Sequence, residues 1–476
     1  MFKLRFVACL GLLLCFLLPG MAFGAADHLH LDGALLSGIW VIPFVCMLLS
    51  IAIMPLAAHH FWEHNFGKIS LGWGLAFIIP CGLIYGMDVA AYQAWHAIAL
   101  EYLPFIILLF ALYTVAGGVR VTGSLAGTPV VNTGILLLGT LLASWMGTTG
   151  AAILFIRPIL RANSHRKFRK HTVVFFIFLV ANVGGSLTPL GDPPLFLGFL
   201  KGVSFFWTTE ALLPMFLFVS ALLLVIYFIM DTILYAKEGK PVPPPNTDPE
   251  TRDEKLGLEG KVNLLLLLGV IAAVLASGSV DVGTISVYHV DIALANLGRD
   301  VVLLILAAVS LRVTAEESRR KNGFTWAPIA EVAKLFLGIF LSMIPAIAIL
   351  QAGEQGALSG VIAMVSKDGQ PVPAMYFWLT GVLSSFLDNA PTYVVFFNTA
   401  GGDAALLMTE YYSTLAAISA GAVFMGANTY IGNAPNFMVR SIAEDRGVAM
   451  PSFFGYMLWS GLVLVPIFVL VTFIFF

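Results

Sequence analysis

Two aspartates lie inside otherwise apolar segments and are the side chains best suited to chemistry. Asp192 stands in the run LGDPP and Asp388 in the run LDNAP. A carboxylate at the centre of a bilayer costs about 2.5–3.5 kcal/mol on the membrane-insertion scale, so its presence there indicates a function. Neither run contains a Lys or Arg, so each carboxylate must take up a proton or hold a cation. Competition between these outcomes is the chemistry that cation/proton exchange requires.

Hydroxyl and amide oxygens stand around both aspartates. Such hard donors suit an alkali cation, and no thiolate or imidazole nearby favours a transition metal. Broken helices also direct their N-termini at a cavity, which favours anions, so cation and anion substrates both stay open here. For single Ser, Thr and Asn residues the alternative role is hydrogen bonding between helices. The predicted sodium- and proton-binding residues are Asp192, Asp388, Asn389, Thr148, Thr149, Ser186, Thr188, Thr392, Asn428, Thr429, Asn433 and Asn436.

The two motifs that carry these residues belong to an internal repeat. Residues 185–197 align without a gap with residues 426–438 at an offset of 241, and five of the thirteen positions are identical. The same offset aligns residues 144–155 with 385–396. Gly, Pro and polar interruptions at membrane depth are tolerated only where the backbone is buried or lines a cavity. Matching interruptions in two halves therefore indicate a transporter binding site.

The composition requires most of the chain to lie in a membrane. It is 59% hydrophobic and 11% charged, against roughly 25% charged residues in a soluble domain. The 25 basic and 27 acidic residues gather in a few connecting segments, so no basic surface for nucleic acid is expected. The polar stretches are too short to form a separate soluble domain.

The predicted fold is an all-α polytopic membrane protein with inverted-topology repeats of five spans each. Two segments, 130–160 and 374–400, are too short to cross twice and are predicted to be re-entrant hairpins. An odd number of crossings per repeat inverts the second repeat relative to the first. The predicted spans are 35–56, 71–87, 97–119, 172–198 (broken), 211–235, 262–277, 298–314, 335–352, 413–438 (broken) and 452–476.

Charge predicts the orientation of these spans. With the mature N-terminus outside, twenty of the 25 basic residues fall in inner segments, three in outer segments and two in the N-terminal segment. This asymmetry satisfies the positive-inside rule. We predict a multi-pass protein of the bacterial inner membrane with its mature N- and C-termini on the outer, periplasmic side.

The chain divides into four predicted parts. Residues 1–26 read as a signal peptide, with an uncleaved first helix as the alternative. Residues 27–235 form the first repeat, 236–261 a cytoplasmic linker and 262–476 the second repeat. The four cysteines predict neither a disulfide framework nor a metal site. His59, His60 and His64 beside Glu63 are expected in a polar inner loop, and Glu101 is expected to be solvated near the outer boundary.

Three motifs resemble one family over essentially the whole mature chain. They are NVGGSLTPLGDPPLF at 182–196, SSFLDNAPT at 384–392 and ANTYIGNAPNFM at 427–438. The chain resembles the ion transporter superfamily, in particular citrate-transporter-like proteins labelled sodium:proton antiporters and related to NhaD-type antiporters. The resemblance implies a scaffold domain and a transport domain that moves like an elevator, usually in a homodimer.

The hairpin tips depart from the superfamily's dicarboxylate carriers. Those carriers are expected to hold sodium and substrate through paired Ser-Asn-Thr triplets, whereas this chain has Gly147-Thr148-Thr149 and Asp388-Asn389-Ala390. A carboxylate at the second tip repels an anionic substrate, which weakens the dicarboxylate interpretation.

The predicted function is therefore a secondary active sodium/proton antiporter with alternating access, not an enzyme, and with no cofactor beyond the transported ions. The alternative is a sodium-coupled citrate or dicarboxylate symporter, and the partners are sodium, protons, the lipid bilayer and, in the alternative, a small carboxylate. An intramembrane aspartyl protease is expected to show Gly-x-Gly-Asp, but Pro189, Leu190 and Gly191 precede Asp192. A channel suits interrupted inverted repeats less well than a transporter.

Overall fold

The computed structural model describes residues 29–123, 125–241 and 255–476, which are mostly helical. In these residues, nine helices are long and apolar enough to cross a membrane. Eight coincide with the eight continuous spans predicted from the sequence, and the ninth is Pro129–Met146, the first arm of the first predicted hairpin. The chain is an all-α polytopic membrane protein, as predicted. The predicted signal peptide lies outside the described residues.

The helices are divided evenly between the two halves of the chain. The first half forms η2 (Gly38–Val41), α2 (Ile42–Ala57), α3 (His59–Tyr85), α4 (Met87–Ala97), η3 (Ile98–Tyr102), α5 (Leu103–Ala116), α6 (Pro129–Met146), α7 (Thr148–Ala162), α8 (Lys170–Leu179), η4 (Val183–Gly185), α9 (Pro193–Leu200) and α10 (Trp207–Lys237). The second half forms α11 (Val262–Ser279), α12 (Leu294–Val313), α13 (Glu316–Lys321), α14 (Ala327–Gln351), η5 (Gly353–Gln355), α15 (Ser359–Val365), α16 (Pro373–Phe386), α17 (Asn389–Thr399), α18 (Ala404–Thr409), α19 (Tyr412–Met425), η6 (Gly426–Asn428), α20 (Ala434–Asp445) and α21 (Phe453–Phe475).

Three short antiparallel ribbons complete the described structure. They pair β1 (Arg120–Thr122) with β2 (Gly257–Glu259), β3 (Thr284–Val287) with β4 (Val290–Ala293), and β5 (Ser366–Lys367) with β6 (Gln370–Pro371). The first ribbon sets Arg120 opposite Glu259 and so ties the end of α5 to the start of α11.

The expectation of a polar loop at the histidine cluster was wrong. Helix α3 begins at His59, well before the apolar span predicted from residue 71, and all three histidines are exposed on its first turns. His59 Nε2 lies 3.4 Å from Glu63 Oε1, four residues on. No breaker interrupts the chain there, so a polar turn continues into the apolar helix. The described residues contain no group of three His, Cys, Asp or Glu side chains arranged to hold a metal.

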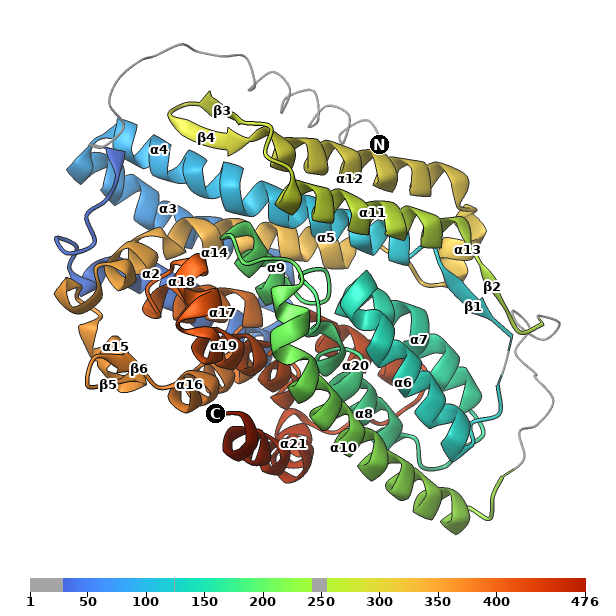
Figure 1. Ribbon diagram of the computed structural model, residues 1–476. Coiled ribbons are helices and arrows are strands. Elements are labelled where there is room, and N and C mark those ends of the chain that lie inside the picture. The colour runs from blue at the N-terminus through green and yellow to red at the C-terminus, as the bar shows by residue number, and fades with distance from the viewer. Residues whose placement is uncertain (1–28, 124, 242–254) are drawn as a thin grey trace.

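The helices pack into two bundles. In the flanking bundle, made of α2–α5, α11, α12 and α14, helix α14 lies on α3 and α2, and α12 lies on α5 and α11. In the core bundle, made of α6–α10, α16, α17 and α19–α21, helix α16 lies on α19, and α10 lies on α6, α8 and α21. Figure 1 shows α4, α11 and α12 along the upper edge of the view and α10 and α21 below them. The bundles meet where α5 contacts α7 and α9, and where α14 contacts α17.

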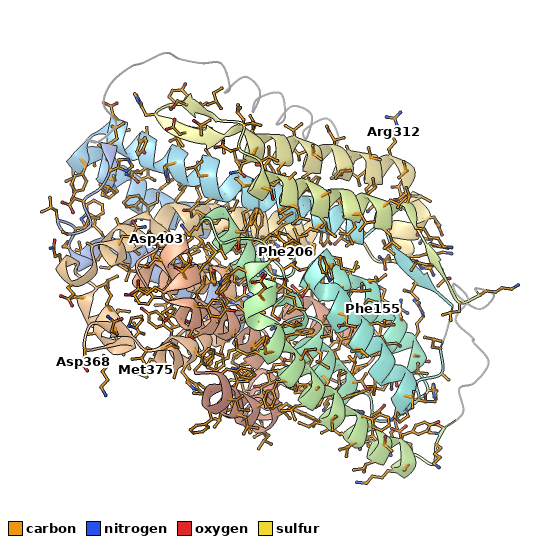
Figure 2. The ribbon with its side chains drawn as sticks, viewed as in Figure 1. Phe155, Phe206, Arg312, Asp368, Met375 and Asp403 are labelled. Carbon is orange, nitrogen blue, oxygen red and sulfur yellow. The ribbon has the colours of Figure 1, made fainter. Side chains whose placement is uncertain are left out.

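The two broken helices lie at the centre of the core bundle. Every residue of α8 from His171 to Leu179 is buried, as is every residue of α19 from Thr414 to Met425. By contrast, α11 buries only Asn263, Val270 and Val274, so most of its apolar surface is left for lipid. Figure 2 shows side chains filling the space between helices, with the exposed Arg312 and Asp368 at opposite edges.

Each broken helix ends in a connection made of turns and bends, which leads into a second, short helix; the last residue of each connection is extended. Asp192 caps α9 with φ −141° and ψ 142°, and Asn433 caps α20 with φ −152° and ψ 138°. A proline follows in the first turn of both helices, where its missing N–H costs no hydrogen bond. The same local sequence thus stops one helix and restarts the next in both halves.

In each of these connections, a pair of glycines lets the end of the connection lie close to the 3-10 turn at its start. A Cβ atom at Gly191 would lie 2.1 Å from the carbonyl oxygen of Gly185, and one at Gly432 would lie 2.6 Å from that of Gly426. The neighbouring atoms are backbone and cannot move aside cheaply. Packing therefore requires glycine at positions 191 and 432.

Substitution of Gly191 by Ala is expected to lower stability by about 1–3 kcal/mol because the new methyl group overpacks a buried turn. Thermal unfolding in detergent measures the effect. Gly134→Ala is the matched control, because Gly134 lies inside α6 with no atom within 4 Å of the place a new methyl group would occupy, and Ala is the better helix former. An unfolding temperature for Gly191→Ala equal to that of Gly134→Ala would contradict the packing argument.

Candidate functional site

A single buried carboxylate joins the two halves of the chain. Asp192 is 1% exposed. Its Oδ1 accepts hydrogen bonds from Thr148 Oγ1 at 2.9 Å and from Asn433 Nδ2 at 3.0 Å. Its Oδ2 accepts one from Asn389 Nδ2. These partners come from the first turn of α7, the N-cap of α20 and the first turn of α17, so both hairpins and both broken helices converge here.

These four residues are two pairs at the repeat offset. Thr148 aligns with Asn389, and Asp192 aligns with Asn433. Asp192 therefore bonds to its own equivalent, Asn433, and both members of the other pair bond to Asp192 as well. Only Asp192 carries a charge. The site is symmetric in position and asymmetric in chemistry.

The backbone that shapes the site also repeats. Thr188 Oγ1 donates to the carbonyl of Ser144, and Thr429 Oγ1 donates to the carbonyl of Ser385 at the equivalent position. Each threonine hydroxyl also accepts a bond of 3.2 Å from the backbone N–H two residues on. These hydroxyls hold the connection in each half against the end of the first helix of its hairpin, α6 or α16.

Asp388 lies beside the quartet of Thr148, Asp192, Asn389 and Asn433 without bonding to it. It caps α17 by accepting a hydrogen bond of 3.0 Å from the N–H of Ala390, and it is half-buried. It directly precedes Asn389, whose amide donates to Asp192. Asp388 therefore lies one residue along the chain from a direct partner of Asp192.

Two amide oxygens near the second hairpin tip are left without a partner. The Oδ1 atoms of Asn389 and Asn428 are buried and accept no hydrogen bond. Asn428 Nδ2 donates to Ser385 Oγ at 2.9 Å, which fixes that amide against the end of α16. A buried acceptor without a donor is costly, and neutral oxygens are ligands that a hard cation accepts. Both features fit a hard cation.

Other predicted site residues have structural partners. Asn436 Nδ2 donates to the carbonyls of Gly426 at 2.8 Å and Thr429 at 2.9 Å. Ser186 Oγ donates to the carbonyl of Val183 at 2.9 Å. Thr392 Oγ1 donates to the carbonyl of Asp388, also at 2.9 Å. These side chains, like Thr188 and Thr429, satisfy freed backbone carbonyls.

Thr149 is half-buried beside Thr148, and its side chain forms no hydrogen bond to another described residue.

Of the twelve predicted site residues, the structure places Thr148, Asn389 and Asn433 in direct contact with Asp192.

Sequence reasoning overlooked Asn182 as a site residue. Asn182 is fully buried where α8 breaks, and its Nδ2 donates to Asn436 Oδ1 at 2.7 Å. Its Oδ1 accepts from Asn433 Nδ2 at 3.2 Å. The available signal was that Asn182 is a single amide after a long apolar run. Its partners in the second half lie about 250 positions away, so the sequence around Asn182 does not reveal them.

A second buried polar cluster fixes the base of the first hairpin. Asp231 on α10 is fully buried, and its Oδ1 atom lies 2.7 Å from Arg166 Nη2 and 2.9 Å from His171 Nε2. Arg166 also pairs with Glu238 at 2.9 Å and donates to the carbonyl of Gly127, just before α6. Burial lowers the pKa of Arg166, but its bonds to Asp231 and Glu238 outweigh burial and raise the pKa overall. This cluster joins α6, α8 and α10 in the first half only.

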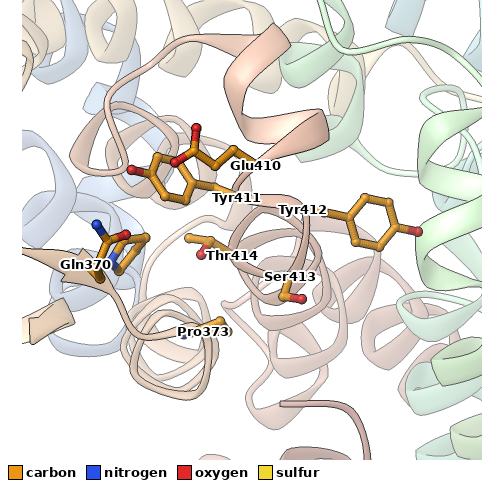
Figure 3. A pocket seen from close by; sticks show the side chains of 8 residues that line it. Gln370, Pro373, Glu410, Tyr411, Tyr412, Ser413 and Thr414 are labelled. Carbon is orange, nitrogen blue, oxygen red and sulfur yellow. The ribbon is translucent and has the colours of Figure 1, made fainter.

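A surface hollow of about 280 Å³ lies apart from the quartet. Figure 3 shows Gln370, Pro373, Glu410, Tyr411 and Thr414 around it, from β6, the start of α16 and the stretch that runs from the end of α18 into α19. It contains none of the predicted site residues. The quartet is instead enclosed by helices.

The fold and its buried polar centre are those of a multi-pass membrane transport protein. The chain matches the family model CitMHS_2, described as "Putative citrate transport", over residues 33–476. It therefore belongs to this family, which confirms the resemblance found in the sequence. No curated protein matches the chain.

Proposed function

We propose that the protein is a secondary active transporter that exchanges sodium for protons at Asp192. The observation that carries this proposal is a fully buried carboxylate whose three hydrogen-bond partners are all neutral. Neutral donors stabilise the charge without cancelling it, so the ionised site attracts a cation or a proton. The same charge repels a carboxylate substrate.

The acceptor capacity of Asp192 leaves space for one more ligand. An ionised carboxylate has about four acceptor positions, and three are occupied. Sodium or a proton takes the fourth, and the two exclude each other because either one neutralises the charge. The free amide oxygens of Asn389 and Asn428 and the nearby carboxylate of Asp388 supply further hard ligands for sodium.

The division of the helices into two bundles, one of which holds the quartet, supports alternating access. The repeated hydrogen bonds at the offset of 241 support two inverted repeats, each with a hairpin and a broken helix. We propose that the core bundle is the transport domain and moves like an elevator along the flanking bundle, which is the scaffold. The positive-inside rule supports an inner-membrane protein with both termini outside.

Replacement of Asp388 by Asn is expected to reduce sodium-driven proton movement strongly while the protein still inserts and folds. Asn retains the capping bond of α17 but removes a charge next to Asp192. Proton flux is measured in proteoliposomes with a pH-sensitive dye, adding sodium, lithium, potassium and citrate in turn.

Asp403→Asn is the matched control. Asp403 caps α18 through the N–H groups of Ala405 and Leu406 at 2.8 and 3.1 Å, on the exposed surface. Its substitution makes the same chemical change away from the site and is expected to leave exchange unchanged. Robust exchange by Asp388→Asn would remove Asp388 from the proposed site.

Sodium-coupled uptake of citrate or a dicarboxylate is the second candidate, and the family description favours it. In this case sodium held by the two aspartates would offset their charge before the anion binds. Accumulation of labelled citrate only in the presence of sodium, with no proton flux from sodium alone, would transfer the assignment to symport.

A further inference from the structure

One ion pair crosses from the core bundle to the flanking bundle. Lys201 Nζ lies 3.1 Å from Glu101 Oε1, and the two side chains are 16% and 18% exposed. Lys201 directly follows α9, and Glu101 lies in η3. Of the ion pairs formed between two described residues, all others lie within the core bundle, within the β1–β2 ribbon or within a single helix. The expectation of a solvated Glu101 was therefore wrong.

Glu101 occupies an unusual helical turn. Residues Ile98–Tyr102 form a π-helical turn between α4 and α5, and such turns are rare and concentrate at functional sites. This turn packs against α9 and α14. The continuous helix formed by α4, η3 and α5 is therefore wider at η3, the turn that contacts the core bundle.

Helix α9 connects this ion pair to the quartet. Asp192 caps its N-terminus and Lys201 its C-terminus, and eight helical residues span about 12 Å. Because so short a helix moves as a rigid rod, a shift of Asp192 relative to the flanking bundle also shifts Lys201. A shift of a few ångströms separates the pair, since its attraction falls with distance.

We infer that Glu101 and Lys201 form a latch that holds the core bundle against the flanking bundle in this conformation and opens once in each transport cycle. The inference rests on the proposed function, because it requires the two bundles to move relative to each other. Two consequences follow: a covalent link across the latch stops transport, and reversal of both charges preserves it.

The first test links the two positions reversibly. Glu101→Cys and Lys201→Cys are introduced together after the four native cysteines are replaced by alanine. A Glu and a Lys side chain that meet at their ends leave a longer gap when both become Cys, and a direct disulfide spans only about 7 Å between Cα atoms. A longer, reducible bis-methanethiosulfonate reagent is therefore used. Linking is expected to lower sodium/proton exchange roughly tenfold or more, with recovery on reduction, because bundle movement limits turnover.

Arg120→Cys with Glu259→Cys is the matched control. This ion pair also measures 3.1 Å, but its two partners lie directly opposite each other in the β1–β2 ribbon. Its link is expected to leave exchange within about twofold of the reduced protein, because no bundle movement crosses it. Undiminished exchange by the linked 101/201 protein would overturn the latch. Absence of exchange in the unlinked protein and wild type would instead overturn the proposed function.

The second test reverses the charges. Glu101→Lys alone sets two ammonium groups side by side and is expected to lower exchange roughly fivefold or more, because repulsion disfavours this conformation. Adding Lys201→Glu restores the attraction, and exchange is expected to return to within about twofold of wild type. Failure of the double reversal to recover, with intact folding by thermal unfolding, would exclude a role for the charge pair.

Discussion

Replacement of Asp192 by Asn is expected to reduce sodium-driven proton movement to the level of liposomes without protein. The amide fits the same space but carries no charge and releases no proton, so neither step of the exchange can occur. Sodium is also expected to raise the unfolding temperature of the wild type, because a ligand that binds only the native state stabilises it. Asn at position 192 should abolish this sodium dependence. Dye-based flux and thermal unfolding with sodium or choline measure the two effects.

The repeat supplies a matched variant for this prediction. Asn433 occupies the equivalent position in the second half and donates to Asp192 at 3.0 Å. Combining Asp192→Asn with Asn433→Asp moves the carboxylate across the site and keeps its composition. We expect the double variant to regain part of the sodium-dependent stabilisation. Full exchange by Asp192→Asn alone would show that the transported ions bind elsewhere.

Replacement of Asp231 by Ala is expected to lower the free energy of unfolding by about 3–5 kcal/mol, because it leaves the buried Arg166 without its closest counter-charge. Four hydrogen bonds to Asp231 are lost with it, from Asn132, Arg166, His171 and Tyr227. Thermal and denaturant unfolding in detergent measure the change. The residual folded protein should still bind sodium, since the cluster does not contact the quartet.

Glu444→Ala is the control for this charge removal. Glu444 pairs with Arg440 at 3.0 Å, four residues apart on α20, and both are partly exposed. Exposed pairs contribute about 0–1 kcal/mol, so little change is expected. Equal free energies of unfolding for Asp231→Ala and Glu444→Ala would show that the Asp231 cluster does not stabilise the base of the first hairpin.

Much of the quartet could be predicted from the sequence because its signals are local. Asp192 and Asn433 each stand before a proline that restarts a helix, and Thr148 and Asn389 each begin the second arm of a hairpin. Helix breaking depends on neighbouring residues, so motif and offset together found these positions. The same reasoning placed the eight continuous spans, which hydropathy alone defines.

Long-range pairing could not be predicted in this way. Asn182 meets Asn436 across 254 positions and Lys201 meets Glu101 across 100. Several predicted ligands also turned out to bond freed backbone carbonyls, as Asn436 and Ser186 do. Composition does not distinguish an amide that satisfies its own backbone from one that faces a substrate, because both occur at the same helix breaks.

The sequence by itself determined that this chain spans a membrane, that two of its motifs recur at an offset of 241, and that a carboxylate stands at each of two interruptions. These properties follow from hydropathy and from residues that stop helices, which act within a few positions. Only the tertiary structure decided that Asp192 is the shared centre and Asp388 its neighbour, and that Glu101 pairs with Lys201. Those outcomes depend on how rigid helices pack, because packing brings together side chains that no local preference connects.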